Sequence, residues 1–122
     1  MSHITRIATR MLERELLEVA ARQLGLGITD GPTTVTDYEG RTQPVDFKLD
    51  SRPYALGFVR TESGFEAVGD LMGGTAETLR CLQQQYARAA TLRQLEEQGF
   101  SVVEETAADG SIRLTLERLV YA

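Results

Sequence analysis

The feature that most constrains the fold is a series of four alternating segments in the middle of the chain. Between residues 33 and 71, β-branched and aromatic residues alternate with polar ones, as in strands that bury one face. The segments span residues 33–38, 45–49, 54–60 and 65–71. Short turn sequences at 39–40 and 62–64 join them in pairs. Because such short turns connect antiparallel neighbours, the sequence predicts a meander.

Helical spacing of apolar residues appears on both sides of these strands. After a short first strand at residues 4–7, the pattern predicts an amphipathic helix that starts at residue 9 or 10 and ends near residue 23. A longer helix is predicted from Thr75, as N-cap, to Gly99. Its apolar residues spread over roughly half of the circumference. We therefore expect a second side of this helix to be covered, by the rest of the fold or by another subunit.

A glycine-rich segment, residues 25–32, follows the first helix. Three glycines and Pro32 predict a connection that resists regular structure. The spacing is not that of a dinucleotide-binding fingerprint, because the third glycine falls one residue late and the segment follows a helix instead of a strand.

The end of the chain has the pattern of a β-hairpin. Residues 100–106 and 111–119 flank Asp109-Gly110, a strong hairpin signal. A two-residue loop would place Val103 opposite Leu116, whereas a three-residue loop with a bulge at Gly110 would place Val102 there. The second register buries more apolar surface, and we prefer it.

Together these elements predict an α+β fold. We expect one domain over residues 1–122, with a mainly antiparallel sheet of about six to seven strands and two helices packed on one face. A ferredoxin-like topology with an enlarged central meander is the closest comparison. The second face of the sheet would then be open for assembly or binding.

Composition limits the classes of function. The net charge of −5 argues against general nucleic-acid binding, which requires clustered cations. No apolar run has the length of a membrane span or of a signal peptide, so we expect no membrane association and a cytoplasmic location. One histidine and one cysteine, Cys81, make a metal site improbable, and no cofactor is expected.

A few residues are candidates for chemistry or binding. His3 is a conceivable lone general base, although it has no recognisable partner. Gly73, Gly74 and Thr75 precede a helix and could bind an anion through their backbone amides, but no Walker lysine accompanies them. Serines 63 and 111 are explained by turns, and the adjacent glutamates of 96–97 and 104–105 do not form acid/base dyads.

Two arginines are the remaining candidates. When the long helix is viewed down its axis, Arg93 falls inside the apolar face, at an angle between those of Leu82 and Tyr86. Tyr86 is a candidate binding residue together with Arg93. The guanidinium either packs its stem on the core and bonds strand-end carbonyls or a carboxylate such as Asp70 or Glu104, or it contacts a partner or a ligand carboxylate. Arg113 has no structural role that the hairpin pattern explains.

Several short stretches resemble one family in order and spacing. They are Ser2-His3-Ile4-Thr5-Arg6-Ile7, Tyr86-Ala87, Thr91-Leu92-Arg93, Gln98-Gly99-Phe100 and Asp109-Gly110-Ser111-Ile112-Arg113-Leu114. The chain resembles the hypothetical chloroplast reading frame family of plastids and cyanobacteria, a domain of unknown function. The resemblance implies an association with an AAA-type ATPase. Residues 72–74 depart from the aromatic-rich segment expected there, which puts a shared ligand contact in that loop in doubt.

The sequence leaves three functional hypotheses. The preferred one is a non-catalytic cytoplasmic interaction module that works in a homo-oligomer or as an adaptor to an AAA-type ATPase. The second is a regulator that binds a small ligand or anion through residues 73–75, Arg93 and Arg113. The third is an unrecognised enzyme that uses His3.

Overall fold

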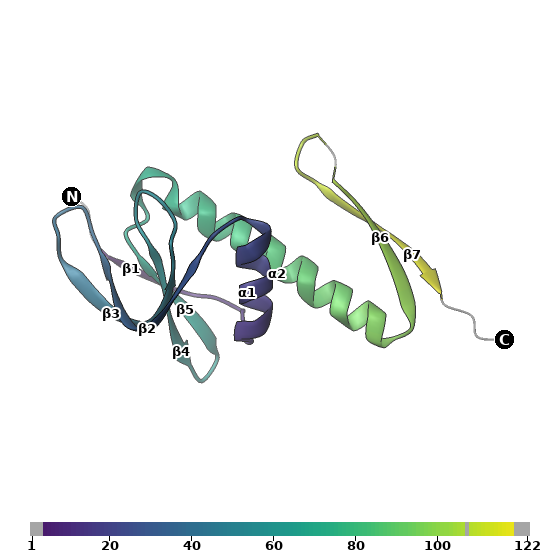
Figure 1. The fold of residues 1–122 in the computed structure, drawn as a ribbon, viewed down its shortest axis with the longest axis horizontal. Helices are drawn as coiled ribbons and strands as arrows, with labels where there is room; N and C mark the ends of the chain where they lie inside the picture. The colour runs from purple at the N-terminus through teal and green to yellow at the C-terminus, as the bar shows by residue number, and fades with distance from the viewer. Residues whose placement is uncertain (1–3, 107, 119–122) are drawn as a thin grey trace. The chain divides into compact units, whose positions relative to one another are not determined.

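The computed structural model describes residues 4–106 and 108–118, and it has the predicted α+β class (Figure 1). The chain divides into two compact units, one up to Tyr86 and one from Ala87 onward. The first contains a five-stranded sheet and the second a two-stranded sheet, so the seven strands occur in two sheets instead of one. The single domain and the ferredoxin-like relation stay predictions.

The first unit is built on an antiparallel sheet with the strand order β1-β5-β4-β3-β2. Its strands are β1 (Thr5–Ala8), β2 (Ile28–Thr36), β3 (Thr42–Leu49), β4 (Leu56–Thr61) and β5 (Gly64–Gly69). The predicted meander forms β2 to β5, and β1 pairs with the last of these strands. The two edges of the sheet are therefore β1 and β2.

The first helix and the part of the second helix up to Tyr86 cover one face of this sheet, as predicted. The two helices are α1 (Arg14–Gln23) and α2 (Thr75–Glu97), and a short 3-10 turn, η1 (Met72–Gly74), precedes α2. Leu17 of α1 and Leu82 of α2 belong to one buried cluster with Phe47 and Phe58 of the sheet. The rings of Phe47 and Phe58 stack at 5.4 Å, and Phe65 meets Phe47 edge-on. This cluster is the main core of the first unit.

A second buried cluster contains Val35, Val45 and Val68. A Cβ placed on Gly57 would lie 2.5 Å from Cγ1 of Val45 and 2.9 Å from Cγ1 of Val35. The end of the β2–β3 hairpin therefore packs directly over the backbone of β4. The expectation of an open second face is wrong in this area, because the hairpin covers it.

The first helix begins later than its periodicity predicts. Residues preceding Arg14 run beside the start of β5 instead: the amide of Thr9 donates to the carbonyl of Phe65 (3.2 Å), and the amide of Phe65 donates to the carbonyl of Met11 (2.8 Å). Glu13, the N-cap, is extended at φ −118°. Tertiary hydrogen bonds here replace the first helical turn that the apolar spacing suggested.

The prediction of an irregular segment at residues 25–32 is partly wrong, because β2 starts at Ile28. The pairing of β2 with β3 shifts between Asp30 and Thr33, which marks a β-bulge at Gly31 and Pro32. A Cβ on Gly31 would lie 2.2 Å from the carbonyl oxygen of Asp46, so only glycine fits. The breaker residues therefore bend the strand and do not end it.

The second unit contains the end of α2 and the hairpin of β6 (Phe100–Thr106) and β7 (Ile112–Arg118). Val102 pairs with Leu116, which confirms the preferred register. The outermost pair is Thr106 with Ile112, so the connection is longer than the three residues expected. Within it, Asp109 accepts hydrogen bonds from the amide (3.0 Å) and hydroxyl (2.7 Å) of Ser111, and Gly110 has a φ of +87°.

Candidate functional site

The buried carboxylate of Asp70 joins two loops at one end of the large sheet. Asp70 follows β5 and its residue is only 1% exposed. Its Oδ1 accepts a hydrogen bond from the amide of Met72, and its Oδ2 accepts one from the amide of Tyr38, both at 3.0 Å. Tyr38 lies in the β2–β3 turn and Met72 begins η1. A single side chain thus fixes these two loops side by side.

A second buried carboxylate, Asp37, organises the β2–β3 turn itself. Its Oδ1 accepts hydrogen bonds from the amides of Glu39 and Arg41, and its Oδ2 accepts one from Nε of Arg41, all at 2.9 Å. Burial alone would raise the pKa of Asp37, but the hydrogen bonds and charge of Arg41 outweigh it and hold that pKa below its ordinary value. The turn is therefore locked around an ionised aspartate.

A third loop, between β3 and β4, reaches the same end of the sheet. Pro53 in this loop approaches η1 so closely that a Cβ on Gly73 would lie 2.8 Å from its Cγ. The neighbouring Tyr54 has a raised pKa, mainly because its hydroxyl is desolvated and also because the carboxylates of Asp70 and Asp37 place negative charge near it. These interactions place the three loops together.

Apolar side chains project from this junction into solvent. Tyr38 is 76% exposed and Met72 is 56% exposed, and Pro53 is also exposed. We call Tyr38, Pro53 and Met72 the three-loop patch. Tyrosine and methionine are enriched in the centres of protein interfaces. The patch is therefore a rigidly supported set of interface-type side chains.

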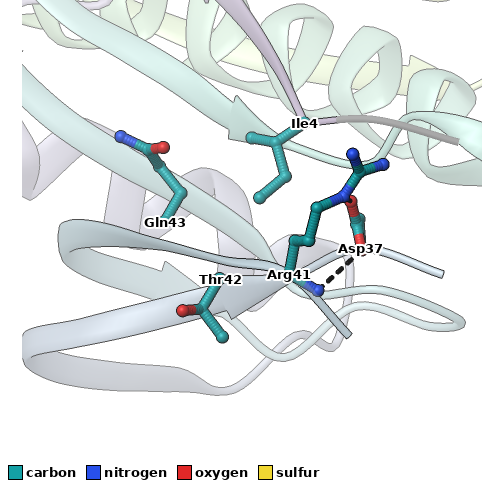
Figure 2. A pocket seen from close by; sticks show the side chains of 5 residues that line it. All are labelled: Ile4, Asp37, Arg41, Thr42 and Gln43. Atoms are coloured by element: carbon teal, nitrogen blue, oxygen red, sulfur yellow. Dashed lines mark hydrogen bonds and ion pairs between the residues drawn. The ribbon is translucent and has the colours of Figure 1, made fainter. Parts of the chain in front are cut away.

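A pocket of about 250 Å³ lies beside the β2–β3 turn (Figure 2). It is lined by Ile4, Asp37, Arg41, Thr42 and Gln43. Arg41 is paired with Asp37 and, at 3.4 Å, with Glu39, so its guanidinium is already balanced by two carboxylates. The pocket thus has no surplus positive charge to attract a free anion.

A smaller pocket, about 210 Å³, is lined by Leu24, Leu26, Glu77, Thr78 and Cys81. The Cys81 thiol is half-buried and lies 3.8 Å from Oε1 of Glu77. Within the described part of the chain, no three His, Cys, Asp or Glu side chains gather in a way that could hold a metal ion. No helix among the described residues is both long and apolar enough to cross a membrane.

The glycine and threonine candidates lie next to the three-loop patch. Gly73 and Gly74 have φ values of +67° and +101° and form the turn into α2. Thr75 is fully buried, and its hydroxyl donates to the carbonyl of Met72 at 3.2 Å instead of facing outward. These residues shape the loop that carries Met72, and the threonine side chain is already engaged.

The other candidates are placed elsewhere. The Tyr86 hydroxyl accepts hydrogen bonds from the amides of Leu12 and Glu13, both at 3.0 Å, and thereby binds the segment that leads into α1. Arg93 is exposed, in contrast to its predicted place within the apolar helical face. Arg113 is exposed on β7, opposite Glu105 in register. His3 lies outside the described residues.

Sequence reasoning missed the residues that build the patch. Asp37 had a local signal, since an aspartate before a short turn that ends in glycine commonly caps the turn. Asp70 had none, because its partners Tyr38 and Met72 lie on different elements. The sequence pattern suggests Asp70 only as a partner for Arg93.

Comparison with known proteins identifies the family. Residues 20–115 match the family described as "Protein of unknown function (DUF1257)". The chain belongs to this family. The chain is 34% identical to "Uncharacterized protein ycf35" of Cyanophora paradoxa and 29% identical to the protein of the same name from Pyropia yezoensis. Each comparison covers 99% of this chain and the whole of the relative. No solved structure is significantly similar to the chain. The resemblance to the hypothetical chloroplast reading frame family is thus confirmed, and the family itself carries no assigned chemistry.

Proposed function

We propose that this member of the family is a non-catalytic interaction module of the cytoplasm that works in an assembly. The observation that carries the proposal is the placement of Tyr38 and Met72, whose backbone amides share the buried Asp70 carboxylate while their side chains are mostly exposed. Exposed tyrosine and methionine side chains on neighbouring loops are of the types that are enriched in protein interfaces.

The supporting loops make this patch suitable for binding. A partner that docks on flexible loops has to offset the entropy that the loops lose, whereas a preorganised surface avoids most of that cost. Asp37 holds its turn through three hydrogen bonds, and Asp70 connects that turn to η1. The exposed tyrosine can then act as an anchor residue of the kind that dominates interface energetics.

The partner we propose is an AAA-type ATPase, which the family resemblance implies. The same assembly can contain further copies of this chain. Binding to either partner requires no catalytic group on this protein. The protein acts as an adaptor that presents a binding surface.

The proposal is tested by the double variant Tyr38→Ala/Met72→Ala. Tagged wild-type and variant proteins are purified gently from the native host, and co-purifying AAA-type ATPases are quantified by mass spectrometry. Binding is then measured with the purified ATPase by calorimetry. We expect the double variant to bind at least about thirtyfold more weakly, since two anchor truncations each cost on the order of 1 kcal/mol or more.

Leu12→Ala is the matched control, because Leu12 is also exposed, at 57%, and lies outside the patch. It should bind like the wild type. Equal binding by the double variant would remove the patch from the proposal. If no AAA-type ATPase binds the wild type either, the adaptor role is wrong.

A further inference from the structure

The β6–β7 hairpin has an edge that the rest of the second unit does not pair. In the described chain β7 has one hydrogen-bonded neighbour, β6, and the sheet contains only these two strands. A two-stranded hairpin is marginally stable on its own, and an unpaired edge strand is a template for another strand. The exposed residues along β7 include Arg113, Thr115, Leu116 and Glu117.

The order of residues along β7 is complementary to itself when the strand is reversed. Its central sequence is Arg-Leu-Thr-Leu-Glu, residues 113–117. In an antiparallel pair of two β7 strands centred on Thr115, position 113 of each copy lies opposite position 117 of the other. Each such pair joins an arginine to a glutamate. Positions 114 and 116, both leucine in the sequence, also lie opposite each other.

We infer that β7 pairs antiparallel with β7 of a second copy, with Thr115 at the two-fold axis, to form a continuous four-stranded sheet. Such an interface is isologous, so one favourable contact is made twice. Opposite charges directly across two strands stabilise the pair, and like charges destabilise it. The inference deepens the proposed function, since it rests on the protein working in an assembly and names a second copy as one partner.

The charge pattern extends across the new sheet. Within one hairpin Arg113 is opposite Glu105, and Ser101 is opposite Glu117. Pairing of the two β7 strands therefore places Arg113 between Glu105 of its own chain and Glu117 of the second copy. The β6 edge lacks this property. If two β6 strands paired antiparallel with Val103 at the centre of the sequence Ser-Val-Val-Glu-Glu, serine would lie opposite glutamate and valine would lie opposite glutamate. The outer edge of β7 is the self-complementary one.

Charge reversal tests the pairing directly. The full-length wild type should show a concentration-dependent monomer–dimer equilibrium by sedimentation velocity. Arg113→Glu alone and Glu117→Arg alone each create two like-charge pairs, so we expect the dimer dissociation constant of each to rise by about tenfold or more. An equimolar mixture of the two variants should form a heterodimer, because every facing pair is then again a glutamate with an arginine.

The controls separate this interface from charge effects in general. Arg22→Glu and Glu62→Arg reverse exposed charges of the first unit and should leave the equilibrium unchanged. Circular dichroism verifies that each variant is folded. If the wild type is a monomer, the inference is wrong, although the proposed contact with an ATPase at the three-loop patch is unaffected. If the single variants dimerise like the wild type, the dimer uses another surface and the inference is equally wrong.

A crosslink tests the position of the axis. Directly opposite residues of an antiparallel pair have Cα atoms about 4.5–5.5 Å apart, which a disulfide can span. In a Cys81→Ala background, Thr115→Cys should form a disulfide-linked dimer on oxidation. The exposed Thr106→Cys on β6 is the matched control and should remain monomeric. Crosslinking of both variants to the same extent would contradict the proposed axis.

Discussion

The hydroxyl of Tyr86 accepts a hydrogen bond from the backbone amide of Glu13, at 3.0 Å across 73 residues of sequence. Glu13 is the N-cap of α1, whose first amides have no partner within the helix. The same hydroxyl accepts a second hydrogen bond from the amide of Leu12. One tyrosine of α2 therefore holds the segment that leads into α1, and it fixes where that helix begins.

Replacing this hydroxyl should reduce stability. Tyr86→Phe keeps the ring and removes the acceptor of two amides, so we expect a loss of about 1–2 kcal/mol in the free energy of unfolding. Urea unfolding followed by circular dichroism measures it. Tyr38→Phe is the control, since its ring is 76% exposed and should change stability by less than about 0.5 kcal/mol. Equal effects of the two changes would show that the Tyr86 hydroxyl does not stabilise the fold.

The buried carboxylate of Asp70 gives a second prediction. Asp70→Asn puts an NH₂ group against one of the two amides that the carboxylate accepts, from Tyr38 and Met72. We expect about 1–3 kcal/mol of destabilisation, because a buried amide loses its partner. Hydrogen exchange should also become faster at these two amides. Asp46→Asn is the control, because this exposed residue accepts from the amide of Arg60, and the change should cost less. Exchange that is unchanged at Tyr38 and Met72 would contradict the role of Asp70.

The packing over Gly57 gives a third prediction. Gly57→Ala places a methyl group 2.5 Å from Cγ1 of Val45, which requires the hairpin to move. Overpacking of this kind costs about 1–3 kcal/mol. The added change Val45→Ala should recover part of that loss, so the two substitutions should be coupled in a double-mutant cycle of unfolding free energies. Strict additivity would show that the hairpin does not pack on β4 in this way.

The depressed pKa of Asp37 gives a prediction on pH. A carboxyl group whose pKa is lower when folded than when unfolded contributes stability above its unfolded pKa, about 3.9, and loses that contribution as the pH falls through the folded pKa. The wild type should therefore be more stable than Asp37→Asn at neutral pH, and the difference should shrink below about pH 4. Denaturant unfolding at a series of pH values measures this gap. A gap that stays constant down to the acid transition would contradict the prediction.

Arg41→Gln is the companion variant for this measurement. It removes the guanidinium that bonds Oδ2 of Asp37 and leaves the backbone amides in place. The pKa of Asp37 should then rise, so the stability that depends on its ionisation should be lost at a higher pH than in the wild type.

Local patterns in the sequence were sufficient for the elements. Alternation of apolar and polar residues predicted the strands of the meander, and the turn at Asp109-Gly110 together with buried apolar area selected the pairing of Val102 with Leu116. Periodicity also located both helices, although it extended α1 by residues that instead bond β5. These properties are encoded by near neighbours, so sequence alone could determine them.

The candidate site depended on contacts that sequence alone does not encode. Tyr38, Pro53 and Met72 come from three separate loops, and Asp70 reveals its role only when two of those loops meet at its two oxygens. The same holds for Gly57, whose missing side chain matters only because Val35 and Val45 pack over it. The amino-acid sequence by itself therefore determined the class of fold, the order of its elements and the hairpin register. Tertiary structure decided which buried polar groups join distant loops, because a buried carboxylate must find its hydrogen-bond donors wherever the folded chain supplies them.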